Sequence, residues 1–135
     1  MSEPVVPIRA LVAGHGDFAD GLVSAVAQIT GRGDTLATLS NRDMSAADVE
    51  RAMREQVDVG GIAVIFTDLP AGSCTMAARR LQRERPDIVL VTGTNLATLL
   101  DFVFHADVAA SEAAHHAADK GRSALVVTGG AASGH

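Results

Sequence analysis

Residues 8–17, which read IRALVAGHGD, join a short apolar run to the start of a helical pattern. The apolar residues 8–13 predict a strand, and apolar residues spaced by three and four along 18–29 predict the helix that follows. His15 therefore lies in the turn between them, where unpaired backbone N–H groups attract anions. The flanking Gly14 and Gly16 leave room for a group as large as phosphate. Because imidazole is a nucleophile that can carry a phosphoryl group, we predict that His15 is a reversible phosphohistidine.

The rest of the chain repeats this alternation of short apolar runs and amphipathic helices. Further strands are predicted at residues 35–39, 62–66 and 88–91 and, close to the end of the chain, at 124–127. The expected helix caps are Ser45 with Asp48, Ser73, Asn95 and Ser111 with Glu112, and the expected helix ends are Gly31, Pro86 and Gly121. The pattern predicts an α/β fold, a doubly wound and mainly parallel sheet with helices on both faces. Residues 1–128 are expected to form a single domain and 129–135 a flexible C-terminal tail.

The composition excludes several classes of function. Of 135 residues 47% are apolar, yet there are four Phe and neither Trp nor Tyr, so the core is expected to consist of Val, Leu, Ile and Ala. A net charge of −5 without a long Lys/Arg cluster argues against nucleic acid as a partner. The arginines within residues 79–85 are interpreted as a solvated helix face or a docking edge. No apolar stretch approaches the roughly 20 residues that cross a bilayer, and no secretory signal is recognisable, so a cytoplasmic protein without membrane insertion is expected.

Two polar residues are expected at the carboxyl edge of the sheet, where open α/β sheets bind ligands. His15 follows the first strand and Asp68 follows the strand at 62–66, so their side chains can meet if these strands are neighbours. A carboxylate that accepts one ring N–H leaves the other nitrogen free to attack. Gly16, Gly72 and Ser73 are the predicted phosphate-binding residues, and this chemistry calls for neither a metal nor a cofactor.

Each of these residues also has a purely structural interpretation. His15 and Asp68 can serve as turn or cap residues, and a helix N-cap accounts fully for Ser73. Gly14, Gly16 and Gly21 have the wrong spacing for a dinucleotide-binding loop.

The other histidines and the single cysteine are weaker candidates. His105 is expected to close a helix, where it suits the helix dipole, and His135 lies in the tail. His115 and His116 are adjacent on a helix and so point in different directions, unlike a metal-binding pair spaced i, i+4. Cys74 lies near a helix N-terminus that could lower its pKa, but we favour a small buried residue, and one cysteine excludes an internal disulfide.

Three blocks of the sequence resemble one protein family. Residues 10–22, ALVAGHGDFADGL, resemble the active-site segment of the Enzyme IIA components of the mannose/fructose/sorbose family of the bacterial phosphoenolpyruvate-dependent sugar phosphotransferase system. Residues 64–73, VIFTDLPAGS, resemble that family's strand, aspartate and Gly-Ser loop, and residues 91–96, VTGTNL, resemble its strand-to-helix corner. The resemblance extends over residues 8–127, nearly the whole domain.

The resemblance implies that His15 accepts a phosphoryl group from phospho-HPr on Nε2 and passes it to a IIB partner for sugar uptake. It also implies that Asp68 hydrogen-bonds the ring, that Ser73 belongs to the phosphate loop, and that a C-terminal antiparallel strand is exchanged in a homodimer. The last point would give residues 124–127 a role. One departure is Pro70, which stands in a loop where the family is often richer in glycine and offers no N–H to phosphate.

Alternative functions remain open at this point. A IIA-like phosphocarrier that serves dihydroxyacetone kinase would use the same chemistry. A regulatory binding module would use the phosphorylation state of His15 to control a partner without sugar transport. In a third interpretation the domain is doubly wound and His15 is structural. No IIB segment follows in these residues, so a separate acceptor protein is expected, with possible association with a membrane permease complex.

Overall fold

The computed structural model describes residues 6–131 of the chain. Four strands form one sheet: β1 (Ala10–Gly14), β2 (Leu36–Ser40), β3 (Val64–Thr67) and β4 (Val89–Val91). Their order is β2-β1-β3-β4, and every neighbouring pair is parallel. The predicted mainly parallel α/β sheet is therefore confirmed, with each of these strands within two residues of its expected position.

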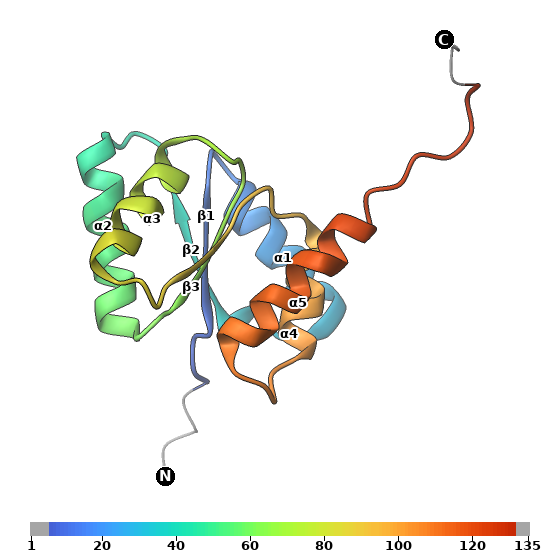
Figure 1. Ribbon diagram of the computed structural model, residues 1–135, viewed down its shortest axis with the longest axis horizontal. Helices are drawn as coiled ribbons and strands as arrows, with labels where there is room; N and C mark the ends of the chain where they lie inside the picture. Colours follow the sequence, from blue (N-terminus) through green and yellow to red (C-terminus); the bar gives the residue numbers. More distant parts are fainter. Residues whose placement is uncertain (1–5, 132–135) are drawn as a thin grey trace.

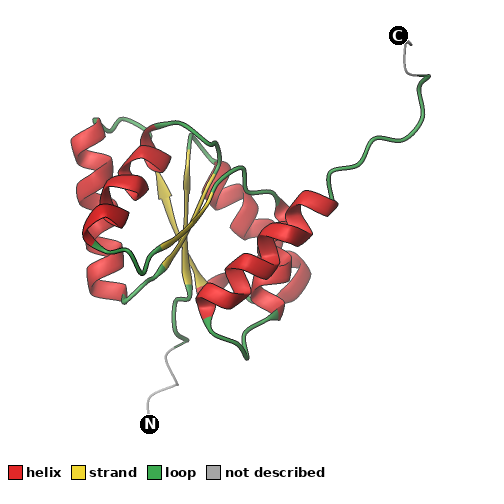
Figure 2. Ribbon diagram, viewed as in Figure 1, coloured by secondary structure: helices red, strands yellow, loops and turns green. Residues whose placement is uncertain are grey.

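Helices cover both faces of this sheet (Figure 1). Those that follow the first three strands are α1 (Phe18–Thr30), α2 (Ala46–Gly60) and α3 (Ser73–Glu84). A short 3₁₀ helix, η1 (Gly33–Thr35), lies between α1 and β2. The last two helices are α4 (Leu96–Phe104) and α5 (Ala110–Ser123). One layer holds α2 and α3, and the other holds α1, α4 and α5, with the sheet between them (Figure 2). This is the doubly wound arrangement that the sequence pattern predicts.

The alternation of side chains along β1 divides the core into two halves. Ala10 and Val12 pack with Phe66 against α1, α4 and α5, whereas Leu11 and Ala13 pack against α2 and α3. Successive residues of a strand point to opposite faces, so a strand buried on both faces is apolar at every position. The five residues of β1 are all buried. The apolar run in residues 8–13 is thus the sequence signature of a central strand.

The strand order creates a switch point between β1 and β3. From β1 the chain crosses to β2 on one side, and it returns to β3 on the other side. Ala13 of β1 lies opposite Thr67 of β3, so the turns that follow these two strands leave the sheet side by side. Ligands in open α/β sheets bind at such a point. The neighbouring strands required for His15 and Asp68 to meet are therefore present.

Several predicted helix ends are confirmed. Ser45 and Asp48 form a reciprocal capping box at the start of α2, and the Asn95 side chain accepts a hydrogen bond from the Thr98 N–H at the start of α4. Gly31 ends α1 in the left-handed conformation.

Three predicted helix ends are wrong. Ser73 is the first residue of α3 rather than its cap, because Gly72 occupies the cap position with φ 143°, a conformation that favours glycine. Gly121 does not end α5, which continues to Ser123. A Cβ on Gly121 would lie 2.0 Å from Thr98 Oγ1, so this glycine permits close packing of α5 on α4. At its other end α5 begins after Ala109, not after Ser111.

The segment that follows α5 forms no strand within this single chain. Residues 124–131 leave the domain and extend away from it (Figure 1). The side chains of Leu125, Val126 and Val127 are exposed to 83%, 75% and 92%. The boundary expected at 128/129 falls in this segment, and residues 132–135 of the predicted tail lie outside the described residues.

Candidate functional site

The side chains of His15 and Asp68 meet at the switch point. Asp68 Oδ2 accepts a hydrogen bond from His15 Nδ1 at 2.7 Å and a second one from the His15 backbone N–H at 2.9 Å. The two residues come from the turns after β1 and β3, 53 positions apart in the sequence. One carboxylate oxygen thus fixes both the turn and the ring, and the predicted pairing of these residues is correct in its geometry.

The protonation of the pair follows from its hydrogen bonds. Burial opposes ionisation of Asp68, but hydrogen bonds from the His15 ring and backbone outweigh that cost and hold the pKa of the carboxyl below its ordinary value. An ionised carboxylate only accepts hydrogen bonds, so His15 Nδ1 carries a proton, and in the neutral ring the lone pair is on Nε2. The Asp68 side chain is 11% exposed and the His15 side chain 53% exposed. The His15 ring is therefore accessible at the surface, and a largely covered carboxylate holds it in place.

Two glycines allow this close approach. A Cβ on Gly14 would lie 2.8 Å from Asp68 Cγ and 2.7 Å from an atom of the Phe18 ring, so no larger residue fits beneath the carboxylate. A Cβ on Gly72 would lie 3.3 Å from His15 Cε1. The loop between β3 and α3 therefore runs directly beside the imidazole ring.

The N-terminus of α3 lies beside the His15 ring. No side chain caps its N-terminus, and the helix dipole favours an anion there. Ser73 Oγ accepts a hydrogen bond from Asn41 Nδ2 at 2.8 Å, and its hydroxyl group can still act as a donor. Pro70, in the same loop, has no N–H. A phosphate near Nε2 would thus lie next to a helix N-terminus and one hydroxyl group. Because of Pro70, the loop offers it one backbone N–H donor fewer than a loop without proline.

Two buried threonines hold the loop between β3 and α3 in place. Thr75 donates its hydroxyl proton to the Leu69 carbonyl oxygen, and the Thr67 hydroxyl lies 2.7 Å from that of Thr75. Since the Thr75 proton is engaged, Thr67 donates in the second hydrogen bond. Both threonines are buried. They link the end of β3 to the first turn of α3 and so position Asp68 and Gly72 relative to each other.

The sequence reasoning missed the contribution of the turn after β2. Asn41 hydrogen-bonds Ser73, and its backbone N–H bonds the Gly14 carbonyl oxygen at 3.1 Å. Arg42 Nη2 lies 3.0 Å from Asp17 Oδ1 and borders Gly16. The signal was available, because polar residues that follow a strand adjoining β1 must reach the same edge of the sheet.

The remaining candidates lie away from this pair or are inert. Cys74 is buried, and burial together with the Asp68 charge raises the pKa of its thiol to about 11, so it is not a reactive thiolate. Two of the four arginines within residues 79–85 are engaged in ion pairs: Arg80 with Glu50, and Arg85 with Asp58 and Asp87. His105 follows the last residue of α4, as expected. His115 and His116 diverge as predicted: His115 borders a groove beside β4, and His116 contacts Asp101.

The doubly wound sheet, with His15 and Asp68 paired at its switch point, places the chain among the small α/β proteins that bind ligands at the carboxyl edge of a parallel sheet. The model of one protein family, EIIA-man, described as the PTS system fructose IIA component, matches residues 9–119. The chain belongs to this family. Membership gives it a general phosphotransfer role in a sugar phosphotransferase system. A search of curated protein sequences finds no significant match.

Solved structures share the fold. The phosphotransferase system component EIIA from Streptococcus agalactiae superposes with a TM-score of 0.76 at 24% identity, covering 88% of this chain and 95% of that chain. The mannose/sorbose specific IIA subunit from Enterococcus faecalis gives 0.74 at 18% identity, over 93% and 98% of the two chains. A sigma-54 interaction domain protein from Enterococcus faecalis gives 0.64 at 19% identity, over 90% and 94%. Among residues 6–131, no helix combines the length and apolarity that a bilayer crossing requires.

Proposed function

We propose that this chain is a phosphocarrier: His15 Nε2 accepts a phosphoryl group from phospho-HPr and passes it to a IIB partner during sugar uptake. The observation that carries the proposal is the hydrogen bond between His15 Nδ1 and Asp68 Oδ2, which keeps a proton on Nδ1 and leaves Nε2 available for the phosphoryl group. Family membership supports it independently. In this role the chain works in the cytoplasm, next to a membrane permease complex that it does not enter.

The transfer is a balanced exchange of one phosphorus–nitrogen bond for another. A bond forms between His15 Nε2 and phosphorus as the bond between phosphorus and the donor's imidazole nitrogen breaks, and the donor ring keeps the electron pair. The Nδ1 proton stays on the ring, and Asp68 stabilises the positive charge that develops there. Transfer to the acceptor reverses these steps. Such a reaction depends on positioning and on stabilising the charge of the transferred group.

The phosphoryl group is expected to lie between Gly16 and the start of α3. Gly72 brings the loop against the ring, and Ser73 keeps a hydroxyl proton available. Backbone N–H groups of the first turn and the helix dipole add attraction for the dianion. We therefore assign Gly16, Gly72 and Ser73 to phosphate binding and His15 and Asp68 to the transfer itself, with no metal in this site.

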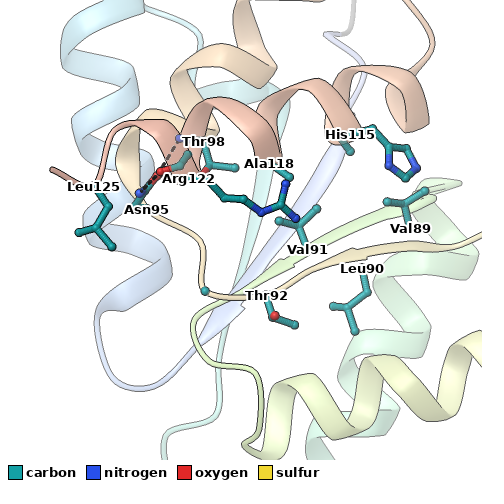
Figure 3. Close-up of a pocket in the computed structure, with 13 residues that line it drawn as sticks. Val89, Leu90, Val91, Thr92, Asn95, Thr98, His115, Ala118, Arg122 and Leu125 are labelled. Atoms are coloured by element: carbon teal, nitrogen blue, oxygen red, sulfur yellow. Dashed lines mark hydrogen bonds between the residues drawn. The ribbon is translucent and has the colours of Figure 1, made fainter.

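The same proposal includes a homodimer with exchanged C-terminal strands. β4 lies at the edge of the sheet, and a groove of about 450 Å³ runs between this strand and α5. His115 and Arg122 extend from α5 along the groove, and Val89 and Val91 form part of its other wall (Figure 3). An edge strand presents unpaired N–H and C=O groups that pair readily with another chain. Residues 124–127 of a second copy, which are apolar and exposed in this chain, fit that edge as an antiparallel strand.

The oligomeric state tests this part of the proposal. The native chain should behave as a dimer in light scattering coupled to size-exclusion chromatography, and Val126→Asp should shift it toward the monomer. Val59→Asp is the matched control, because Val59 is also highly exposed, at 83% against 75% for Val126, but lies at the end of α2. A native monomer at all concentrations, or a Val126→Asp variant as dimeric as the control, would show that strand exchange does not occur.

The acceptor can differ without any change at His15. The sigma-54 interaction domain protein shares this fold, which supports a regulatory module as a second candidate. A dihydroxyacetone kinase is a third possible acceptor, since the chemistry at the carrier histidine is the same. The readout that separates these functions is the protein to which the labelled chain transfers its phosphoryl group.

Phosphoryl labelling tests the central claim. The native chain and His15→Ala are incubated with Enzyme I, HPr and labelled phosphoenolpyruvate, with His116→Ala as a control histidine distant from the pair. We expect acid-labile label on the native chain and on His116→Ala and none on His15→Ala. Full labelling of His15→Ala, or no label on the native chain, would refute the phosphocarrier role.

A further inference from the structure

A second group of ligand-type side chains lies in the layer of α4 and α5. It consists of Asp101, His105 and His116, whose potential ligand atoms all lie within 4.8 Å of one another. Asp101 and His105 are one turn apart at the end of α4, and α5 brings His116 to them. The Arg9 guanidinium, from the residue before β1, donates to the His105 carbonyl oxygen at 3.1 Å. The cluster is therefore near the amino edge of the sheet, opposite the edge that holds His15.

The protonation of His105 suits a ligand. Its Nδ1 lies 2.8 Å from the backbone carbonyl oxygen of Asp101, which can only accept a hydrogen bond, so Nδ1 carries the proton. The lone pair of this ring is then on Nε2. Metal-binding histidines commonly donate their second ring nitrogen to a backbone carbonyl, which fixes the tautomer and the ring orientation.

The side chains of Asp101 and His116 are in direct contact, and His105 lies close to both. His116 Nδ1 lies 2.7 Å from Asp101 Oδ2, and His105 Nδ1 lies 3.5 Å from the same oxygen. The centres of the two imidazole rings are 4.5 Å apart, and the Asp101 side chain is only 13% exposed. Movement of the His116 proton from Nδ1 to Nε2 frees Nδ1 for a metal.

We propose that Asp101, His105 and His116 bind a divalent transition-metal cation of the Zn²⁺ type. Two neutral imidazoles and one carboxylate are a ligand set that Zn²⁺ accepts, with water in the fourth position. Metal–ligand distances of about 2.0–2.2 Å place the ligands of a tetrahedral ion roughly 3.4 Å apart. The potential ligand atoms of the cluster lie within 4.8 Å of one another, so small rotations of the partly exposed side chains would bring them to that spacing.

A cation in this position would connect α4 to α5. The two helices already pack closely through Gly121, and a metal near the other end of the pair would add a second link between them. Metal binding contributes to folding stability whenever the site exists only in the folded state. Binding here is separate from phosphoryl transfer, because none of the three ligands contacts the His15–Asp68 pair.

Titration with Co²⁺ tests this site on the tag-free full chain. Co²⁺ should raise the melting temperature of the native chain and produce visible absorption typical of tetrahedral coordination, and EDTA should reverse both effects. His116→Ala and Asp101→Asn should each weaken Co²⁺ binding by about 10-fold or more, as loss of a ligand or its support does. His115→Ala, which removes the neighbouring histidine beside the β4 groove, should bind Co²⁺ as the native chain does.

Three results would overturn the proposal. They are no change in melting temperature or absorption on addition of Co²⁺, unaltered affinity in His116→Ala, and an equal loss of affinity in His115→Ala. Should Asp101→Asn fail to fold, judged by circular dichroism, His105→Gln provides the second ligand variant. Labelling at His15 is measured in parallel, so that failure of the metal site and failure of the phosphocarrier proposal are recorded separately.

Discussion

The substitution Asp68→Asn separates the charge of the aspartate from its shape. The asparagine oxygen can still accept the hydrogen bonds from the His15 ring and backbone, which are 2.7 and 2.9 Å long in the native chain. It cannot stabilise the positive ring that forms as Nε2 takes up the phosphoryl group. The perturbation therefore acts on the transition state and the phosphorylated form far more than on the resting protein.

The expected loss follows from the strength of a hydrogen bond to a charged group, about 1.5–3 kcal/mol. Since each 1.36 kcal/mol corresponds to a tenfold change in rate, kcat/KM for transfer from phospho-HPr should fall by roughly 10- to 150-fold. Rapid-quench measurement of label on the variant gives this rate, and Asp87→Asn is the control. Asp87 is an exposed carboxylate that contacts Arg85, so its loss changes the net charge equally without touching the His15 ring.

The pH dependence of the free energy of unfolding gives a second test of the role of Asp68. Because the pKa of Asp68 lies below its ordinary value of 3.8 in the folded protein, its charged form stabilises the fold above that pH. The contribution is lost as the pH falls below 3.8 through the lower pKa of the folded state. The free energy of unfolding of the native chain should therefore fall toward that of Asp68→Asn in this acid range. A transfer rate within twofold of the native rate, or a stability difference that does not depend on pH, would refute the reasoning.

Three further substitutions test the fold around the site. Gly72→Ala places a Cβ 3.3 Å from His15 Cε1 at φ 143°, so it should cost about 1–3 kcal/mol in chemical denaturation and slow labelling. Ser45→Ala removes the cap of α2 and should cost about 0.5–2 kcal/mol with no change in labelling; a slower rate would contradict this assignment. Gly121→Ala would force a methyl group to within 2.0 Å of Thr98 Oγ1 and should lower the melting temperature, with a cost of about 1–3 kcal/mol for overpacking. An unchanged melting temperature would mean that α4 and α5 separate easily.

Much of the fold could be predicted from the spacing of apolar residues. The buried run of β1 and the amphipathic pattern of α1 are strictly local signals, and they led directly to the turn that holds His15. The meeting of His15 with Asp68 needed one more fact, that β1 and β3 are neighbours. Strand order depends on how all the helices pack, so the sequence made this arrangement plausible without deciding it.

The errors have a common physical cause. Glycine and serine were interpreted by their most frequent local roles, as a helix end at Gly121 and a helix cap at Ser73. In the structure Gly121 is required by its contact with Thr98, and Ser73 is bonded to Asn41. These are contacts between elements distant in the sequence. The grouping of Asp101, His105 and His116 was missed for the same reason, since it spans two helices.

The missing N–H of Pro70 bears on how long a phosphoryl group would remain on this protein. A hydrogen bond to a charged group is worth about 1.5–3 kcal/mol, so each donor that a loop lacks makes the bound dianion easier to release. A carrier whose phosphorylated form is very stable would hold the phosphoryl group and slow its transfer to the acceptor. When the phosphorylated form is less stable, transfer can run in either direction. The degrees of phosphorylation of the donor and acceptor proteins then set the net direction of transfer.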